Sequence, residues 1–379
     1  MSAAKSDHSQ RLILCLVADE EAIERFPAVV RYLQVGLIDE PVKVILVVPE
    51  HNRASTLISG PTSVLSYSKM SWPFRHWTVR TLISKVQQKI DSIQHDATVI
   101  VHGLALTTAP LAAAIATATG GELVLNVSSA AMMDDLDLMR WLDHASALVT
   151  PVEAIREAIK TSPLAAKSAE VIPLGVVSED APAAFNEPQN TPTVVYAGAL
   201  TADAGLDTLL LATRHVLQKR AGLQLFILGK GPAESQLRHM AESLNIGLNV
   251  TFTGRLEHLR AAMRAADVFC LPHALPVFRE ELIHAMALGL VVIAARGSFC
   301  DDLIDRQTAL LFPERDEIEL ARRIDDLLDQ PELARTIAAT GQARARSHHS
   351  VSKMVAGFLR LYRQLGSRHE TLPIAAHTR

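Results

Sequence analysis

The stretches RLILCLVA (11–18) and VKVILVVP (42–49) are short apolar runs rich in Val, Leu and Ile, and a helical-looking segment at 22–37 separates them. Apolar runs of this length, bounded by polar residues, favour buried β-strands. Further runs follow in the first half of the chain at ATVIVHG (97–103), ELVLNVS (122–128) and ALVT (147–150). Strand and helix signals that alternate in this way predict a mostly parallel sheet with right-handed crossovers.

The same rhythm restarts after VIPLGVVSEDAPAAFNEPQNTPT (171–193), a stretch with four prolines that is typical of a linker. The apolar runs of the second half lie at 193–199, 223–231, 249–255, 267–273, 290–296 and 309–313. Beyond them the chain is expected to be helical at 317–328, 332–348 and 352–365. We therefore predict an α/β protein with a Rossmann-like domain at 1–170, a linker at 171–193, a second Rossmann-like domain at 194–350, a C-terminal helix at 351–367 that can pack back on the first domain, and a tail at 368–379.

Length and composition agree with two domains and narrow the class of protein. A chain of 379 residues exceeds what one hydrophobic core usually supports. Apolar residues make up 49 % of the chain but aromatic residues only 4 %, a mixture that suits parallel sheets covered by helices. The formal charge of −4 argues against nucleic acid as a partner, because such proteins neutralise phosphates with a basic surface.

Location is predicted from three kinds of signal. The three cysteines are too few for a disulfide framework, the N-terminus is polar, and no segment sustains about 20 apolar residues. We expect a cytoplasmic protein with neither an export signal nor a membrane span. Peripheral contact with the inner face of the membrane stays open, because it needs only an amphipathic surface.

Ligands of open α/β sheets bind beyond the carboxyl ends of the strands. The loops expected to bind a ligand are therefore those after residues 199, 231, 255, 273 and 296. Together with the strands before them, these loops resemble the C-terminal domain of family 4 glycosyltransferases over about 191–365. The resemblance rests on AGAL-x4-GLDTLLLA (197–212), ILGKGPAESQL (227–237), VTFTGR (250–255), AADVFCLPH (265–273), AMALGLVVIA (285–294) and LLFP (310–313). The linker segment VIPLGV (171–176) is similar to the family's Ile-Pro-x-Gly-Val.

The resemblance implies the GT-B fold, with two Rossmann-like domains whose parallel sheets face each other across a cleft. It implies a nucleotide diphosphate sugar as donor on the second domain and a saccharide or glycolipid acceptor on the first. Transfer would retain the anomeric configuration and would be independent of metal, with no bound cofactor. Cations of the protein must then stabilise the leaving diphosphate.

Two positions where the family usually carries these cations are alanines here. The family has Arg beside the glycine of the first loop and Lys before the next glycine, and this chain has Ala199 and Ala204. Gly198 and Gly205 are kept, so the loop shape can persist without its charge. Loss of two charge-assisted contacts would weaken diphosphate binding by about 10²- to 10⁴-fold.

The resemblance also implies two donor-binding glutamates eight residues apart, and these positions hold Pro276 and His284. The side chain of Pro276 cannot accept a hydrogen bond, whereas His284 could still bind a ribose and is a catalytic candidate. Glu280 and Glu281 are candidate replacements, although acidic residues at a helix start also favour the helix dipole.

Two basic residues could replace the missing cations. Lys230 lies between Gly229 and Gly231 in a strand-to-helix turn, and Arg255 ends a strand. A solvated lysine and a surface ion pair explain them equally well. Gly297, Ser298 and Asp301 occupy the place of a Gly-Gly-x-x-Glu turn of the family, where Asp301 could instead cap a helix.

In the first half, His102 ends a predicted buried strand, which makes it a second catalytic candidate, although a lone histidine is more often structural. The segment 68–90 combines Trp72, Phe74 and Trp77 with five Lys and Arg side chains. It could contact anionic lipid or an extended acceptor, or its aromatic side chains could pack under a loop.

Two functions remain open from the sequence. The chain could be an active glycosyltransferase with an unusual donor site, or a catalytically silent relative that binds or scaffolds. The loop glycines favour a maintained fold, whereas Ala199, Ala204, Pro276 and His284 argue against tight donor binding.

Overall fold

The computed structural model describes residues 12–25, 27–50, 62–68, 75–93, 97–167, 169–177, 182–185, 191–254, 256 and 259–370. The chain forms two compact units. The first comprises Met1–Gly175 and Val351–Arg379, and the second comprises Val176–Ser350.

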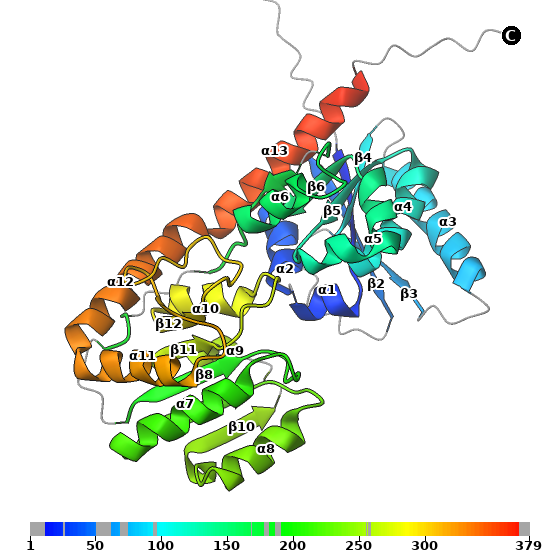
Figure 1. Cartoon of the computed structure of the whole chain (residues 1–379). Coiled ribbons are helices and arrows are strands. Elements are labelled where there is room, and N and C mark those ends of the chain that lie inside the picture. Colours follow the sequence, from blue (N-terminus) through cyan, green and yellow to red (C-terminus); the bar gives the residue numbers. More distant parts are fainter. Residues whose placement is uncertain are drawn as a thin grey trace, which may run out of the picture. The chain divides into compact units, whose positions relative to one another are not determined.

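The first unit is built on a seven-stranded parallel sheet with the order β3-β2-β1-β4-β5-β6-β7 (Figure 1). Its strands are β1 (Leu12–Val17), β2 (Val42–Pro49), β3 (Ser63–Tyr67), β4 (Thr98–Gly103), β5 (Glu122–Asn126), β6 (Ala147–Thr150) and β7 (Ala169–Val171). Every residue of β1 is buried, because helices cover both faces of a sheet of this kind.

The helices of the first unit are α1 (Glu20–Arg25), α2 (Pro27–Gly36), α3 (Arg75–Ile93), α4 (Ala109–Thr119), α5 (Leu136–His144), α6 (Glu153–Lys160) and α13 (Val351–Glu370). The single helix expected at 22–37 is two helices, since Pro27 lacks a backbone N–H donor and starts a new helix.

The C-terminal helix α13 belongs to the first unit, where it packs against α2, β4 and β1 (Figure 1). Gly36 of α2 allows this close approach, because a Cβ atom there would lie 2.6 Å from a methyl group of Val355. Two ion pairs hold the exposed side of the helix: Arg363 with Glu40 at 2.8 Å, and Arg360 with Glu170.

The second unit contains a six-stranded parallel sheet with the order β10-β9-β8-β11-β12-β13. Its strands are β8 (Thr193–Ala197), β9 (Gln224–Leu228), β10 (Val250–Gly254), β11 (Val268–Leu271), β12 (Val291–Ala295) and β13 (Leu310–Phe312). Its helices are α7 (Leu206–Lys219), α8 (Glu234–Ser243), α9 (Leu259–Met263), α10 (Glu280–Leu288), α11 (Glu317–Asp329) and α12 (Pro331–His348). The prediction of two parallel α/β sheets is confirmed.

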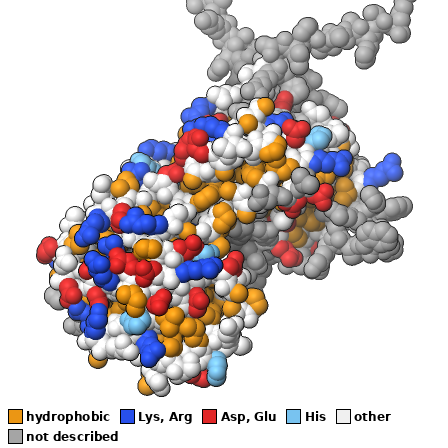
Figure 2. Space-filling model, viewed as in Figure 1, with side chains coloured by type: hydrophobic (Ala, Val, Ile, Leu, Met, Phe, Trp, Pro, Cys, Tyr) orange, Lys and Arg blue, Asp and Glu red, His pale blue; other side chains and the backbone are white. Residues whose placement is uncertain are grey.

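Acidic and basic side chains are interspersed on the face of the second unit formed by α7 and α11 (Figure 2). Lys219 and Arg220, at the end of α7, both form ion pairs with Asp325 of α11. These helices lie in contact, so the charges on this face join two helices of one unit.

Candidate functional site

The order of the second sheet defines one place where a ligand can enter. The chain runs from β8 outward through β9 to β10, then returns to β11 on the other side of β8. The loops after β8 and β11 therefore leave the sheet in opposite directions, and such a switch point is where open α/β sheets bind ligands. These two loops, 198–205 and 272–279, form the candidate site.

The loop after β8 lies directly against the loop after β9. Leu200 donates its backbone N–H to the carbonyl oxygen of Lys230 at 3.0 Å. Cβ atoms at Gly229 and Gly231 would overlap the carbonyl oxygens of Gly198 and Leu200. Close packing of one backbone on another therefore explains these glycines without any ligand.

Gly205 has a similar role on the other side of the loop. Its φ of +70° is in the left-handed region that favours glycine, and it begins α7. A Cβ atom there would lie 2.9 Å from the Cβ atom of His273, which follows β11. The two loops of the switch point are thus in contact, and His273 in turn pairs with Glu314, from the loop after β13.

The side chain of Arg279 joins the two loops of the site. It comes from the residue that precedes α10, and its Nη2 donates to the carbonyl oxygen of Ala197 at 2.8 Å. Its Nε lies 3.3 Å from a carboxylate oxygen of Glu281, and its guanidinium lies 5.9 Å from the ring centroid of Tyr196. A Cβ atom at Gly198 would overlap Nη2, so only glycine leaves room for this side chain.

The charge of Arg279 is well held although its side chain is only 14 % exposed. Burial disfavours the charged form, but the attraction of Glu281 and Tyr196 outweighs burial and raises the pKa of Arg279 above its usual value. No motif in the sequence singles out Arg279, which directly precedes Glu280 and Glu281. Its place beside Gly198 is a contact between residues 81 positions apart in the chain (279 − 198), which no local pattern signals.

The two alanines at the predicted cation positions differ from each other. Ala199 is exposed, and the carbonyl oxygen of this residue accepts a hydrogen bond from the Tyr196 hydroxyl at 2.9 Å. Ala204 is 4 % exposed and belongs to the hydrophobic core of the second unit. In this loop, position 199 is open to a ligand and position 204 is not.

Of the two residues that could replace the missing cations, the structure describes only Lys230. Lys230 is exposed, and its Cε atom lies over Gly254, where a Cβ atom would be 3.2 Å away. Within the described part of the chain Lys230 has no hydrogen-bond or ion-pair partner. Arg255 lies outside the described residues.

His284 is buried in α10, with 7 % of its surface exposed. Burial, together with the positive charges of Arg260 and His349, lowers the pKa of His284 to about 4. Its Nδ1 has no hydrogen-bond partner among the described residues. A neutral, buried imidazole fits a structural role in the unit better than the catalytic or ribose-binding role expected from its position.

Glu280 and Glu281 begin α10, as expected, and Glu281 is the partner of Arg279. Its carboxylate therefore balances a cation of the protein. Pro276 is exposed in the same loop.

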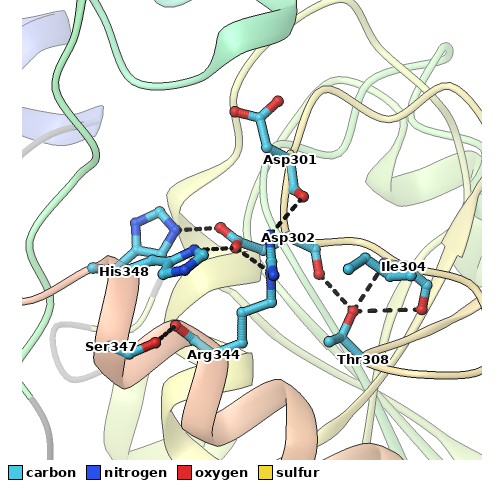
Figure 3. Close-up of polar contacts among 8 residues, drawn as sticks. Asp301, Asp302, Ile304, Thr308, Arg344, Ser347 and His348 are labelled. Carbon is cyan, nitrogen blue, oxygen red and sulfur yellow. Dashed lines mark hydrogen bonds and ion pairs between the residues drawn. The ribbon is translucent and has the colours of Figure 1, made fainter.

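The loop after β12 is held inside the second unit. Gly297, with φ of +92°, is exposed, and the Ser298 hydroxyl donates to the carbonyl oxygen of Ala295 at 2.8 Å. The carboxylate of Asp301 is exposed and points away from the polar cluster beside it (Figure 3). Asp301 does not cap a regular helix here, because α11 starts only at Glu317. Burial raises the pKa of the Cys300 thiol to about 12, which favours the neutral thiol over the reactive thiolate.

The neighbouring Asp302 is the centre of this polar cluster (Figure 3). Its carboxylate is 6 % exposed and pairs with Arg344 Nε at 2.6 Å, His348 Nδ1 at 2.9 Å and His349 Nε2 at 2.6 Å. Burial alone would raise the pKa of Asp302, but the hydrogen bonds of the two histidines and the charge of Arg344 lower it to about 2. The cluster fastens the end of α12 to the loop after β12.

His102, the candidate of the first unit, is completely buried. Its Nδ1 lies 2.7 Å from the Tyr362 hydroxyl, and its Nε2 lies 2.9 Å from Asn126 Oδ1. Burial lowers the pKa of His102 to about 4, although the hydrogen bond with Asn126 opposes this shift. With no exposed atoms and two satisfied ring nitrogens, His102 fits the structural alternative and not contact with a substrate.

The basic segment 68–90 is described only in part. Trp72 and Phe74 lie outside the described residues, and nothing is described of the Trp77 side chain. In α3 the apolar residues Leu82, Val86 and Ile90 are buried in the first unit, while Arg80 and Lys85 are exposed. The apolar stripe of this part of α3 is therefore already covered by protein.

Among the described residues, none of the helices combines the length and the apolar character needed to span a membrane. The same residues contain no group of three or more His, Cys, Asp or Glu side chains that could hold a metal ion.

Comparison with known proteins connects this architecture with glycosyltransferases. Residues 177–344 match the sequence model of the family glycosyl transferases group 1. The match falls within the second unit and covers less than half of the chain.

A curated relative is the GDP-mannose-dependent monoacylated alpha-(1-6)-phosphatidylinositol monomannoside mannosyltransferase of Corynebacterium glutamicum. The two proteins are 30 % identical over 169 residues, which is 42 % of this chain and 44 % of the relative. The matched region thus spans less than half the length of that relative.

Solved structures extend the likeness of the fold to both units. Sucrose-phosphate synthase from Thermosynechococcus elongatus matches with a TM-score of 0.75 and 20 % identity, over 94 % of this chain and 100 % of that one. Anabaena HepE in complex with UDP matches with a TM-score of 0.73 and 16 % identity, over 93 % and 99 % of the two chains. The fold is that of the GT-B glycosyltransferases, as the sequence resemblance implied.

Proposed function

We propose that the second unit binds a nucleotide diphosphate sugar at the switch point between β8 and β11. The observation that carries this proposal is that the family match at 177–344 spans the loops 198–205 and 272–279. The loops hold Gly198 and Gly205 at positive φ, and they expose Ala199 at the carboxyl edge of the sheet. A nucleotide approaching this edge meets backbone amides and the Arg279 side chain.

We further propose that the chain transfers the sugar to a saccharide or lipid-linked acceptor with retained configuration and without a metal ion or bound cofactor. A lipid-linked acceptor is supported by the name of the Corynebacterium relative, which acts on a phosphatidylinositol mannoside. The acceptor would bind through the first unit. Segment 68–90 would be its membrane-facing part, with the exposed Arg80 and Lys85 directed to anionic lipid.

The nucleotide proposal is tested with the full chain by thermal unfolding in the presence of single ligands. UDP, UDP-glucose, GDP and GDP-mannose are suitable probes. HepE was solved in complex with UDP, and the Corynebacterium relative is named as GDP-mannose-dependent. A ligand that binds only the native state stabilises it by RT ln(1 + [L]/Kd), so occupancy at millimolar concentration raises the Tm. Uridine and guanosine are the controls without phosphate.

A rise in Tm with one diphosphate or its sugar, and no rise with the nucleosides, supports the proposal. No rise with any of the four at millimolar concentration would overturn it.

A silent binding protein is the second candidate function, favoured by the buried, neutral His284 and by Pro276 at the predicted glutamate positions. The two functions are separated by following each bound nucleotide sugar for release of free nucleoside diphosphate, with mannosylated lipid extract as acceptor. Turnover supports the transferase, and the anomeric configuration of the product tests retention. Binding without release of nucleoside diphosphate supports the silent relative.

A further inference from the structure

We propose that Arg279 supplies the positive charge that holds the diphosphate of the donor, in place of the cations absent at Ala199 and Ala204. This inference rests on the nucleotide-binding function proposed above. It assigns that role to a side chain from the loop after β11, whereas the expected cations would have come from the loop after β8.

The position of the guanidinium is the first support. Nη2 of Arg279 bonds the carbonyl oxygen of Ala197, the last residue of β8, and lies against the Cα atom of Gly198. The exposed Ala199 is the next residue of the chain. Arg279 therefore places a cation at the carboxyl edge of the second sheet, beside the loop 198–205, which contains no Lys or Arg.

The chemistry of the pair with Glu281 is the second support. The Nε–Oε2 distance of 3.3 Å is longer than the 2.7–2.9 Å of a strong charge-assisted hydrogen bond. A guanidinium has five N–H donors, and the described contacts to Ala197, Glu281 and Tyr196 do not use all of them. A diphosphate carries more negative charge than one carboxylate, so it can compete with Glu281 for the N–H donors of Arg279.

The cost of burying a charge is the third support. The side chains of Arg279 and Glu281 are 14 % and 21 % exposed, and a buried ion pair is weak evidence for stability. A brace between two loops could be made with apolar residues. A buried arginine in a switch-point loop, with glycine opposite, fits an anion-binding role better.

Other charged residues lie on the elements around this position and affect the binding of an anion. Glu281 and Glu280 lie at the start of α10, and the exposed Asp203 lies in the loop after β8. The exposed Lys230 lies on the neighbouring loop after β9. These carboxylates repel an anion, so Lys230 alone would not offset them, and the proposal requires the positive charge of Arg279 as well.

The test measures binding of UDP, GDP and inorganic pyrophosphate to the full chain by calorimetric titration. Arg279→Gln should weaken the binding of whichever nucleotide the wild type binds by about 10- to 100-fold, and it should weaken the binding of pyrophosphate in parallel. Arg279→Lys should give an intermediate loss, since it keeps the charge but not the planar fork. Glu281→Gln should bind more tightly than the wild type, because it frees the guanidinium.

Arg220→Gln is the matched control. Arg220 ends α7 just before β9 begins, at the amino edge of the same sheet, and also pairs with carboxylates. Its loss should leave nucleotide affinity unchanged. Thermal unfolding of each variant verifies that the protein is folded, and where Arg279→Gln does not fold, Arg279→Lys and Glu281→Gln decide.

The outcomes separate this inference from the function on which it rests. The wild type could bind UDP or GDP while neither Arg279 variant weakens this binding and Glu281→Gln does not strengthen it. That result would show that Arg279 only connects the two loops, with nucleotide binding intact. Absence of binding by the wild type itself overturns both.

Discussion

The Nδ1 atom of His102 lies 2.7 Å from the hydroxyl oxygen of Tyr362, a residue 260 positions later in the chain. The contact joins β4 to the C-terminal helix α13 inside the first unit. Phe358, one turn earlier on α13, places its ring 5.3 Å from the imidazole. The neutral imidazole accepts from Tyr362 and donates through Nε2 to Asn126, so the histidine specifies where the last helix docks.

Tyr362→Phe should destabilise the chain by about 1–2 kcal/mol, because it leaves the buried Nδ1 of His102 without its donor. Chemical denaturation measures this change in the free energy of unfolding. Tyr32→Phe is the matched control, since Tyr32 is only partly buried and its hydroxyl has no partner in the described structure. An equal effect of the two substitutions would show that the contact with His102 contributes nothing.

Stability should fall as the pH drops from about 6.5 to about 4. Burial lowers the pKa values of His102 and His284 to about 4, whereas an unfolded chain titrates its histidines near 6.5. Between these values the unfolded state binds protons that the folded state does not. Each histidine then contributes a slope of up to about 1.4 kcal/mol per pH unit.

His284→Gln isolates one of these contributions, because glutamine stays neutral throughout this range. The free energy of unfolding, measured from pH 7 to pH 4, should depend less steeply on pH in the variant than in the wild type. Identical pH profiles would mean that the folded state also protonates His284.

The framework of both sheets could be predicted from the sequence because its inner strands are continuous apolar runs. Strand β1 is one such run, buried along its whole length. The edge strands β3 and β7 were missed for the same physical reason. β3 is short and contains two serines among its five residues, β7 has three residues, and both are mostly only partly buried. Edge strands of this kind lack the hydrophobic signal on which the prediction depends.

The candidate site was predictable as a set of loops but not as a set of contacts. The switch-point loops follow from the order of the strands, and Gly198 and Gly205 lie in them as expected. The role of Arg279 depends on its reach across to Gly198, and the burial of His102 depends on Tyr362. Both are contacts between distant segments, on which periodicity and motif spacing carry no information.

Asp302→Asn should destabilise the chain by about 2–3 kcal/mol, because Arg344, His348 and His349 lose the charge that they share. The lowered pKa of Asp302, about 2, gives the same contribution a pH dependence. It is fully present above the unfolded value near 3.9 and is lost as the pH falls through about 2.

The neighbouring Asp301→Asn is the control for this substitution. Its carboxylate is exposed and points away from the cluster, so its loss should change stability by no more than about 0.5 kcal/mol (Figure 3). Denaturation of the two variants side by side at pH 7 compares them directly. Equal stabilities would refute the importance of the buried carboxylate.

Restoring the two missing cations should have opposite consequences. Ala199 is exposed beside the Arg279 fork, so Ala199→Arg should change stability by no more than about 0.5 kcal/mol. Its added charge-assisted contact should tighten UDP or GDP binding by about 10-fold. Ala204 is 4 % exposed in the core of the second unit, so Ala204→Lys should cost about 2–4 kcal/mol of stability. Titration and thermal unfolding of both variants measure the two effects. If Ala204→Lys were stable and bound nucleotide more tightly than Ala199→Arg, then position 204, and not position 199, would face the ligand.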